Sequence, residues 1–262
     1  RHLGAKDVLS YSESYGKDRD WYGEFSLRYN RQLGDHNVSG LLLYNQQKTY
    51  YPSVYTEIPT GYVGLVGRVT YDYKTRYMID LNMGYNGSEN FSPEKRFGFF
   101  PAFGLGWAIS NEAWWESLQE TVSYFKVRYT DGLVGTDAVT GRRFMYLDQM
   151  ASVDGYRFGD QNNGVGGWGF SKYGANVGWS TSRKQDLGVD LKFFKDNLSL
   201  TLDIFKEHRK DIFITRRVIP DYSGFVEMPY ANLGVVDNKG FEATLEYTQQ
   251  LGKKCFLTVR GN

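Results

Sequence analysis

Hydrophobic and polar residues alternate along most of this chain with a period of two. From Tyr77 to Tyr85, every second side chain is apolar, and most of the residues between them are polar or glycine. Side chains of a β-strand point alternately to its two faces, so this pattern predicts a strand with one apolar and one polar face. The same alternation predicts about ten strands, at residues 22–32, 37–47, 69–73, 77–85, 98–109, 121–130, 183–195, 198–208, 239–249 and 254–260.

The apolar faces have aliphatic centres and aromatic ends. In one strand, Ile79, Leu81 and Met83 lie between Tyr77 and Tyr85. This order is typical of strands that cross a membrane in a β-barrel. No run of eighteen apolar residues is present, which excludes a transmembrane helix. The negative mean hydropathy is compatible with a barrel, because every second residue of a barrel strand faces a polar lumen. We therefore predict an all-β fold, a transmembrane antiparallel β-barrel.

The expected connections alternate between short and long. Short turns are expected at 33–36, 74–76, 196–197 and 250–253, and long loops at 48–62, 86–97, 131–182 and 209–236. Bacterial barrels have short periplasmic turns and longer outer loops. We therefore expect the long loops to face the cell exterior. The linker 109–120 then falls on the periplasmic side, and residues 111–119 within it suit one helical turn.

Two long segments resemble one known family. The first runs from Tyr71 to Trp115, and the second combines Trp179 with residues 186–213 and 231–247. Both are similar to SusC-like TonB-dependent outer-membrane transporters. The residues that carry the first match are Tyr71, Tyr73, Arg76, Tyr77, Asn86, Gly87, Ser88, Glu89, Asn90, Phe91, Arg96, Phe97, Gly98, Phe100, Pro101, Gly106, Trp107, Ser110 and Glu112.

The resemblance implies a function and partners. The implied activity is energy-coupled import of oligosaccharides across the outer membrane of a Gram-negative bacterium by a multi-pass barrel. The implied partners are TonB, acting through a plug, a SusD-like surface lipoprotein, outer-membrane lipid, and a dimer of transporter–lipoprotein pairs. Plugged transporters have about 22 strands. We therefore expect residues 1–262 to be an internal part of the barrel, with the plug and the C-terminal strands outside this chain.

Aromatic residues in the expected long loops are the candidate substrate contacts. They form two groups, Tyr50, Tyr51 and Tyr55 in one loop and Trp168, Phe170 and Tyr173 in another. Aromatic faces stack on sugar rings, and their hydroxyl and N–H groups add polar contacts. The alternative interpretation is that these side chains pack the loops against each other or against a partner.

Other chemistry finds little support in the sequence. The single Cys255 excludes a disulfide framework, and the three histidines are far apart, so we expect no metal and no cofactor. Glycines at 164–169 match a dinucleotide-binding pattern but lack the strand and helix that such a site needs, which favours a flexible loop. The net charge of +1 gives no indication of a nucleic-acid partner.

Charged residues on the expected strands also allow two interpretations. Carboxylates such as Asp80, Asp190, Asp203, Glu242 and Glu246 alternate along strands, which is typical of a wet barrel wall. A glycosidase would need two of them at a fixed separation around a sugar, and we expect no enzyme. The basic run 206–210 allows an anion-binding patch, although a solvated strand end near the membrane rim explains it more simply.

Two alternative functions remain open at this point. In the first, the chain belongs to the same type of transporter, but the substrate is an oligopeptide or another nutrient. In the second, the chain is a soluble all-β carbohydrate-binding module, whose apolar faces would have to be buried against a second sheet. Solubility without detergent would favour the second alternative.

Overall fold

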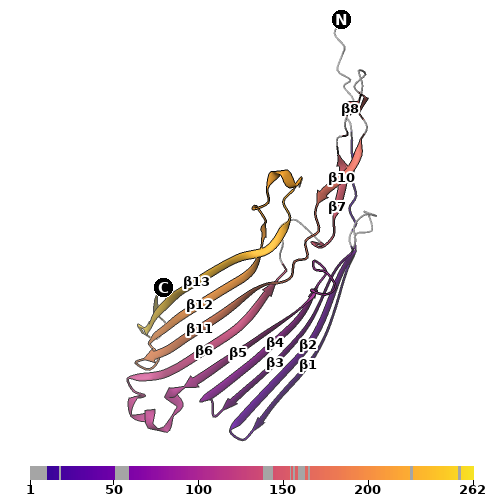
Figure 1. Cartoon of the computed structure of the whole chain (residues 1–262). Helices are drawn as coiled ribbons and strands as arrows, with labels where there is room; N and C mark the ends of the chain where they lie inside the picture. The colour runs from indigo at the N-terminus through magenta and orange to yellow at the C-terminus, as the bar shows by residue number, and fades with distance from the viewer. Residues whose placement is uncertain are drawn as a thin grey trace.

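Ten strands form one antiparallel sheet in the computed structural model (Figure 1). The structure describes residues 11–17, 19–50, 59–137, 144–153, 155, 157–158, 163–164, 166–224, 227–252 and 255–262. The strands, in their order across the sheet, are β1 (Arg19–Leu33), β2 (His36–Tyr50), β3 (Thr60–Tyr73), β4 (Tyr77–Ser88), β5 (Phe97–Ala108), β6 (Val122–Thr136), β11 (Ser180–Phe193), β12 (Leu198–Thr215), β13 (Tyr230–Gln250) and β14 (Phe256–Gly261). The prediction of an all-β fold with about ten antiparallel strands is confirmed.

The remaining elements are short. Two small ribbons lie between β6 and β11, one of β7 (Gln149–Val153) with β10 (Gly167–Lys172), the other of β8 (Arg157–Phe158) with β9 (Asn163–Gly164). The 3-10 helices are η1 (Ile109–Asn111), η2 (Ala113–Leu118) and η3 (Asp221–Ser223), and the first two confirm the helical turn expected in the linker. Among the described residues, no helix has the length and apolar character needed to cross a membrane.

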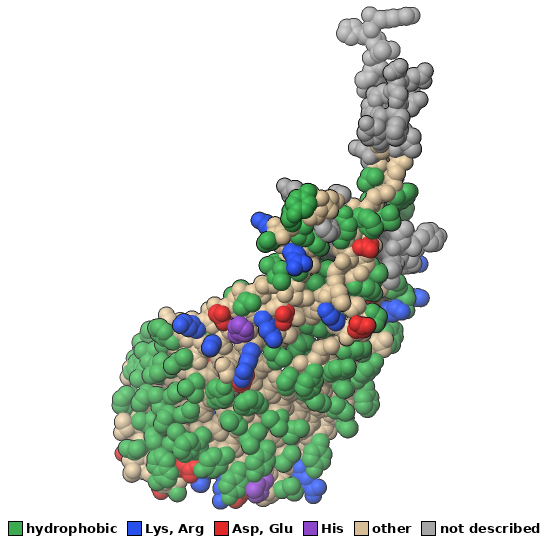
Figure 2. Space-filling model, in the orientation of Figure 1, with side chains coloured by type: hydrophobic (Ala, Val, Ile, Leu, Met, Phe, Trp, Pro, Cys, Tyr) green, Lys and Arg blue, Asp and Glu red, His purple; other side chains and the backbone are tan. Residues whose placement is uncertain are grey.

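The two faces of the sheet differ as the alternation predicts. Leu81 is 52% exposed and lies between Val69 of β3 and Phe103 of β5 in the strand register. We call this exposed apolar side the outer face, and Figure 2 shows hydrophobic side chains covering much of the sheet. Aromatic rings end the apolar part of β4, where Tyr77 stacks on Trp107 and Tyr85 stacks on Phe97, with centroid distances of 6.3 and 5.2 Å.

Short and long connections fall on opposite edges of the sheet. The turns β1–β2, β3–β4, β11–β12 and β13–β14 lie on one edge together with η1 and η2 (Figure 1). The connections β2–β3, β4–β5, β6–β11 and β12–β13 lie on the other, which we call the loop edge. This arrangement confirms the alternation of connection lengths, whereas the side of the membrane on which each edge lies stays a prediction.

Several strands extend further toward the loop edge than the sequence pattern suggests. β3 begins at Thr60, β12 continues to Thr215 and β13 begins at Tyr230, so parts of two expected loops, 48–62 and 209–236, are strand. In β3, glycines hide the pattern, and Gly64 leaves room for the inward side chains of Asn45 and Asn86 on the neighbouring strands. In β12, the register with β13 shifts between 209 and 213, around Asp211 at φ 57°, and breaks the alternation.

Glu112 holds together the edge that carries the short turns. Its carboxylate accepts hydrogen bonds from the Tyr77 hydroxyl at 2.7 Å and from the Trp107 indole N–H at 3.1 Å. It also pairs with the Arg76 guanidinium at 3.3 Å. These contacts lower the pKa of Glu112, with the hydrogen bonds from Tyr77 and Trp107 as the largest causes. The linker after β5 is therefore fixed to the β3–β4 turn.

The buried apolar residues lie outside the middle of the sheet. Trp115 of η2, with Ala108 and Ile109, is buried at the short-turn edge, and its indole N–H donates to the carbonyl of Val122 at 3.1 Å. The other buried apolar group lies at the loop edge, between the connections that leave the sheet there. Among the described residues, the apolar side chains on the outer face of the sheet are half-buried or exposed instead.

Candidate functional site

The loops of the loop edge are joined at their base by a small apolar cluster. Phe91 of the β4–β5 loop and Met145 after β6 are fully buried, and Ala175 and Val177 before β11 are nearly so. The flanking aromatic residues are Trp179, Phe213 and Tyr230, and the Phe91 ring lies 5.3 Å from that of Trp179 and 5.9 Å from that of Phe213. We call the seven residues the loop-base cluster. It joins segments that are more than a hundred residues apart in the chain.

Hydrogen bonds around this cluster connect the same segments. Asn232 at the start of β13 accepts from the Gly178 N–H at 2.9 Å and donates to the carbonyls of Gly178 and Asp211, at 3.0 and 2.7 Å. The Met145 N–H donates to the Asn90 carbonyl at 3.0 Å. Because one amide side chain satisfies three backbone groups, Asn232 fixes β12, β13 and the approach to β11 together. Its position in an expected loop gave no sign of this role.

Several residues that carry the family resemblance belong to this base. Phe91 is its central ring, and Trp179 donates its indole N–H to the Arg96 carbonyl at 3.2 Å. Ser88 donates to the Asp137 carboxylate at 2.5 Å, and the Glu89 carboxylate accepts from the Gly61 N–H at 2.6 Å. These residues therefore position the loops relative to one another.

The ribbon of β7 and β10 carries the second group of predicted aromatic residues away from the sheet (Figure 1). Trp168 is 74% exposed and Phe170 is 44% exposed. The Phe170 ring stacks on that of Tyr173, with centroids 5.4 Å apart and planes at 29°. The structure therefore brings Phe170 and Tyr173 together and leaves the indole of Trp168 open to a ligand.

The first group of predicted aromatic residues is described only in part. Tyr50 is the last residue of β2, is 37% exposed, and has the Lys48 ammonium 4.9 Å from its ring centroid. Tyr51 and Tyr55 lie outside the described residues. The role of these tyrosines in substrate contact stays a prediction.

A polar groove lies beside the loop-base cluster. It has a volume of about 430 Å³ and lies between the segment before β11 and the start of β13. Asn176, Arg216 and Tyr230 contribute polar groups, and Lys95 reaches across to the carbonyl of Asn176 at 2.8 Å. Such a groove offers hydrogen-bond donors and an aromatic ring to a polar chain.

Several ion pairs lie on the inner face of the sheet. The Arg68 guanidinium pairs with Asp80 through two nitrogens. Arg128 contacts three carboxylates, Asp186 at 3.1 Å, Asp190 at 3.3 Å and also Asp203. The prediction that Asp80, Asp190 and Asp203 lie on one polar face is confirmed, and the structure adds the arginines that hold them. Each of these carboxylates contacts an arginine, an arrangement that suits a charged wall.

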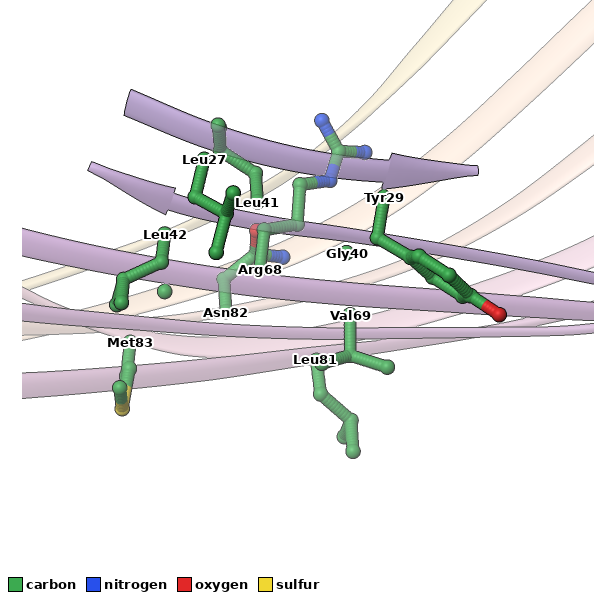
Figure 3. A pocket seen from close by; sticks show the side chains of 11 residues that line it. Leu27, Tyr29, Gly40, Leu41, Leu42, Arg68, Val69, Leu81, Asn82 and Met83 are labelled. Carbon is green, nitrogen blue, oxygen red and sulfur yellow. The ribbon is translucent and has the colours of Figure 1, made fainter. Parts of the chain in front are cut away.

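The apolar cavity on the outer face has a different character. It has a volume of about 440 Å³ and lies over β1 to β4, at the level where Gly40 and Gly67 have no side chains. In Figure 3, Leu42, Val69, Leu81 and Met83 extend to one side of the strands. This cavity lies at the middle of the strands, away from the loops. Most of its lining belongs to the exposed apolar face, so the cavity suits a hydrocarbon chain rather than a polar substrate.

Metal-binding chemistry has no candidate in the part of the chain that the structure describes. No three histidine, cysteine, aspartate or glutamate side chains gather there in a way that would hold a metal ion. The three aspartates around Arg128 are held by its guanidinium instead.

Comparison with known proteins identifies the family. The profile of the family described as TonB dependent receptor-like, beta-barrel matches residues 3–262. The chain is 28% identical over 259 residues to TonB-dependent receptor P3 of Formosa agariphila, covering 88% of this chain and 25% of that protein. It is 26% identical over 186 residues to TonB-dependent receptor SusC of Bacteroides thetaiotaomicron, covering 70% and 18%. The chain thus spans about a quarter of the length of P3 and less of SusC.

Solved structures share the fold. The RagAB peptide transporter superposes with a TM-score of 0.73 at 17% identity, covering 93% of this chain and 29% of that one. The siderophore receptor PirA from Pseudomonas aeruginosa superposes with a TM-score of 0.56 at 13% identity, covering 94% and 43%. Three findings agree with the resemblance to SusC-like transporters: the matching family profile, the similar proteins, and the sheet with its apolar outer face. This chain belongs to the TonB-dependent receptor-like β-barrel family.

Proposed function

We propose that this chain is part of the barrel of a TonB-dependent importer of the SusC type in a Gram-negative outer membrane. The observation that carries the proposal is the contrast between the two faces of one continuous sheet. The outer face exposes aliphatic side chains between aromatic rows, and the inner face carries ion pairs on β3, β4, β6, β11 and β12. That contrast suits a wall between lipid and a wet lumen.

The proposal extends to the parts and partners beyond this chain. A plug and further strands would complete a barrel of about 22 strands. TonB would supply the driving force through that plug, and a SusD-like lipoprotein would cover the loop edge on the cell exterior. A pair of such transporter–lipoprotein units would form the dimer. The proposal assigns no catalytic step, cofactor or metal to these residues.

Oligosaccharides are the substrate class that we propose. Trp168 offers an open indole at the projecting ribbon, and the stacked Phe170–Tyr173 pair offers a second flat surface. Flat aromatic surfaces suit sugar rings. Tyr50, Tyr51 and Tyr55 are proposed to add contacts from the β2–β3 connection.

Oligopeptides are the second candidate. The fold similarity to RagAB, which is described as a peptide transporter, favours them. The groove with Lys95, Asn176 and Arg216 supplies groups that would pair with peptide carbonyls and carboxylates. A soluble carbohydrate-binding module is disfavoured, because its ten strands would need a second sheet over the outer face and all ten lie in one sheet.

Uptake by the full-length protein tests the proposal. Cells that depend on it would be supplied with a mixture of oligosaccharides from glycan digestion or with a mixture of peptides from casein. We expect growth on oligosaccharides to require TonB and to fall when Trp168 and Phe170 are both replaced by alanine. Tyr222→Ala, which removes an equally open aromatic ring elsewhere at the loop edge, should leave growth unchanged.

Each result decides between the alternatives. Uptake of peptides but not of oligosaccharides would show that the substrate class is oligopeptides. Unchanged growth of the Trp168→Ala, Phe170→Ala variant at normal outer-membrane abundance would remove the ribbon from substrate capture. Growth without TonB would refute an energy-coupled importer and indicate a passive pore.

A further inference from the structure

The outer face of β11, β12 and β13 changes from apolar to cationic along the strands. Leu202 and Ile204 of β12 and Phe241 of β13 are 39%, 63% and 79% exposed. The next outward positions toward the loop edge are Lys206 on β12 and Lys239 on β13, and both are exposed. Figure 2 shows this transition as a row of charged side chains along the border of the green region.

Lys206 and Lys239 lie directly opposite each other in the register of β12 and β13. Opposed residues of antiparallel strands have Cβ atoms about 5 Å apart, and like charges at such positions are destabilising. The nearby carboxylates Glu207 and Glu242 do not relieve the repulsion, because Glu207 lies on the inner face of β12 and Glu242 on that of β13. The two ammonium groups therefore create a local concentration of positive charge just above exposed apolar side chains.

The carboxylates on this part of the outer face already have side-chain partners within the chain. Asp237 lies 2.7 Å from His208, and Asp131 forms two hydrogen bonds with Arg183, at 3.0 and 2.6 Å. Among the described residues, neither Lys206 nor Lys239 forms an ion pair. The site therefore retains two positive charges that an anion from outside the chain would neutralise.

We propose that Lys206 and Lys239 together bind the phosphate group of a lipid in the leaflet on the loop-edge side. The apolar border at Ile204 and Phe241 would contact the acyl chains, and the lysines above it would reach the headgroup. Long lysine side chains suit this position, since their stems pack on apolar surface while their ammonium groups extend to the interface. Basic residues next to a membrane attract anionic headgroups. Lys210, two outward positions further along β12, would face a second phosphate.

The site is confined to one sector of the sheet. Where β4 and β5 reach the border of their apolar region, they carry the stacked pair Tyr85 and Phe97 instead of opposed lysines. Aromatic rings suit the interface without selecting a charged lipid. We therefore expect one localised phosphate site at β12–β13 rather than a ring around the barrel. The inference rests on the membrane insertion proposed above.

Lipid titration of the full-length protein in nonionic detergent tests the site. The probe is bisphosphorylated lipid A, and the readout is the lipid concentration that gives half of the maximal rise in Tm. The double variant Lys206→Gln, Lys239→Gln should require about 30-fold more lipid, roughly fivefold for each lysine. The control variant is Lys184→Gln, Lys192→Gln, which removes the same charge from the inner face of β11 and should bind lipid normally.

Further measurements separate a binding site from a structural role. Without lipid, the double variant should be at least as stable as the unaltered protein, because the repulsion between the lysines is removed. An unchanged half-point, or an equal change in the control variant, would overturn the proposal. Equal stabilisation by dephosphorylated lipid A would also overturn it, and equal stabilisation by inorganic phosphate would indicate a site for free anions. If the unaltered protein binds lipid A as expected but imports neither oligosaccharides nor peptides, the transport function is refuted and this site stands.

Discussion

The carboxylate of Glu112 accepts a hydrogen bond from the hydroxyl of Tyr77 at 2.7 Å, across a separation of 35 residues. Tyr77 begins β4, and Glu112 lies between η1 and η2 beyond β5. Arg76 and Trp107 contact the same carboxylate. All four residues carry the family resemblance, and their shared role is to fix the linker at the short-turn edge.

The first prediction concerns the pH dependence of this contact. The pKa of Glu112 is lowered in the folded protein, so its stabilising effect is present above the unfolded pKa of about 4.3 and is lost as the pH falls through the lower folded value. Glu112→Gln should therefore unfold at a lower temperature than the unaltered protein at pH 7. The difference should shrink as the pH falls below the unfolded pKa. Glu94→Gln, an exposed carboxylate of the β4–β5 loop, is the control.

The second prediction concerns the loop-base cluster. Phe91→Ala removes a fully buried ring, which typically costs about 3–5 kcal/mol. We expect the loss to act locally, so the loops at residues 144–179 become sensitive to protease while the barrel keeps its heat-modifiable mobility on gels. Phe99→Ala, on the exposed outer face, should not change loop cleavage. Protection of the loops in the Phe91 variant would show that other contacts hold them.

The third prediction compares the two faces at adjacent positions. Leu81 lies on the outer face, and Asn82 lies on the inner face, where it donates to Asp80 at 2.9 Å. If the outer face contacts lipid near the bilayer centre, Leu81→Arg should cost about 2–4 kcal/mol. Asn82→Arg should be much milder, because the arginine enters a polar surface beside a carboxylate. Unfolding of the refolded full-length barrel measures both, and equal costs would contradict this placement of lipid and lumen.

The fourth prediction concerns the carboxylates around Arg128. Arg128→Leu leaves Asp186, Asp190 and Asp203 close together without their shared cation. The groups are partly exposed, so we expect a cost of about 1–3 kcal/mol. Adding Asp203→Asn to Arg128→Leu should recover part of this loss, since it removes one of the repelling charges. A double-mutant cycle of unfolding free energies measures the coupling, and additive effects would argue against it.

The fifth prediction concerns the orientation of the sheet. With Cys255 first replaced by serine, cysteine introduced at Glu94 in the β4–β5 loop should react with a membrane-impermeant maleimide on intact cells. Cysteine introduced at Asp196, in the β11–β12 turn, should react only after the outer membrane is opened. Both positions are exposed, so access and not burial decides the outcome. The reverse labelling pattern would invert the assignment of the two edges.

The strand number, the two faces and the alternation of loop lengths could be predicted from the sequence. Each follows from local physics, because a period of two assigns residues such as Leu81 and Asn82 to opposite faces regardless of distant contacts. The pattern placed Trp168 and Phe170 in a loop, whereas both lie in strand β10; Trp168 is 74% exposed, and the role of these residues in substrate contact stays a prediction. The ends of the strands were predicted less accurately. The glycines of β3 and the shifted register near Asp211 interrupt the hydrophobic alternation, although the strands remain paired there.

The partners of individual side chains were decided only by the tertiary structure. Arg128 lies 58 to 75 residues from the three aspartates that it contacts, and Asn232 lies 54 residues from Gly178. The opposition of Lys206 and Lys239 likewise depends on the register of β12 with β13. A one-residue change of register would move every side chain of a strand to the other face, and local sequence specifies the face but not the partner across it.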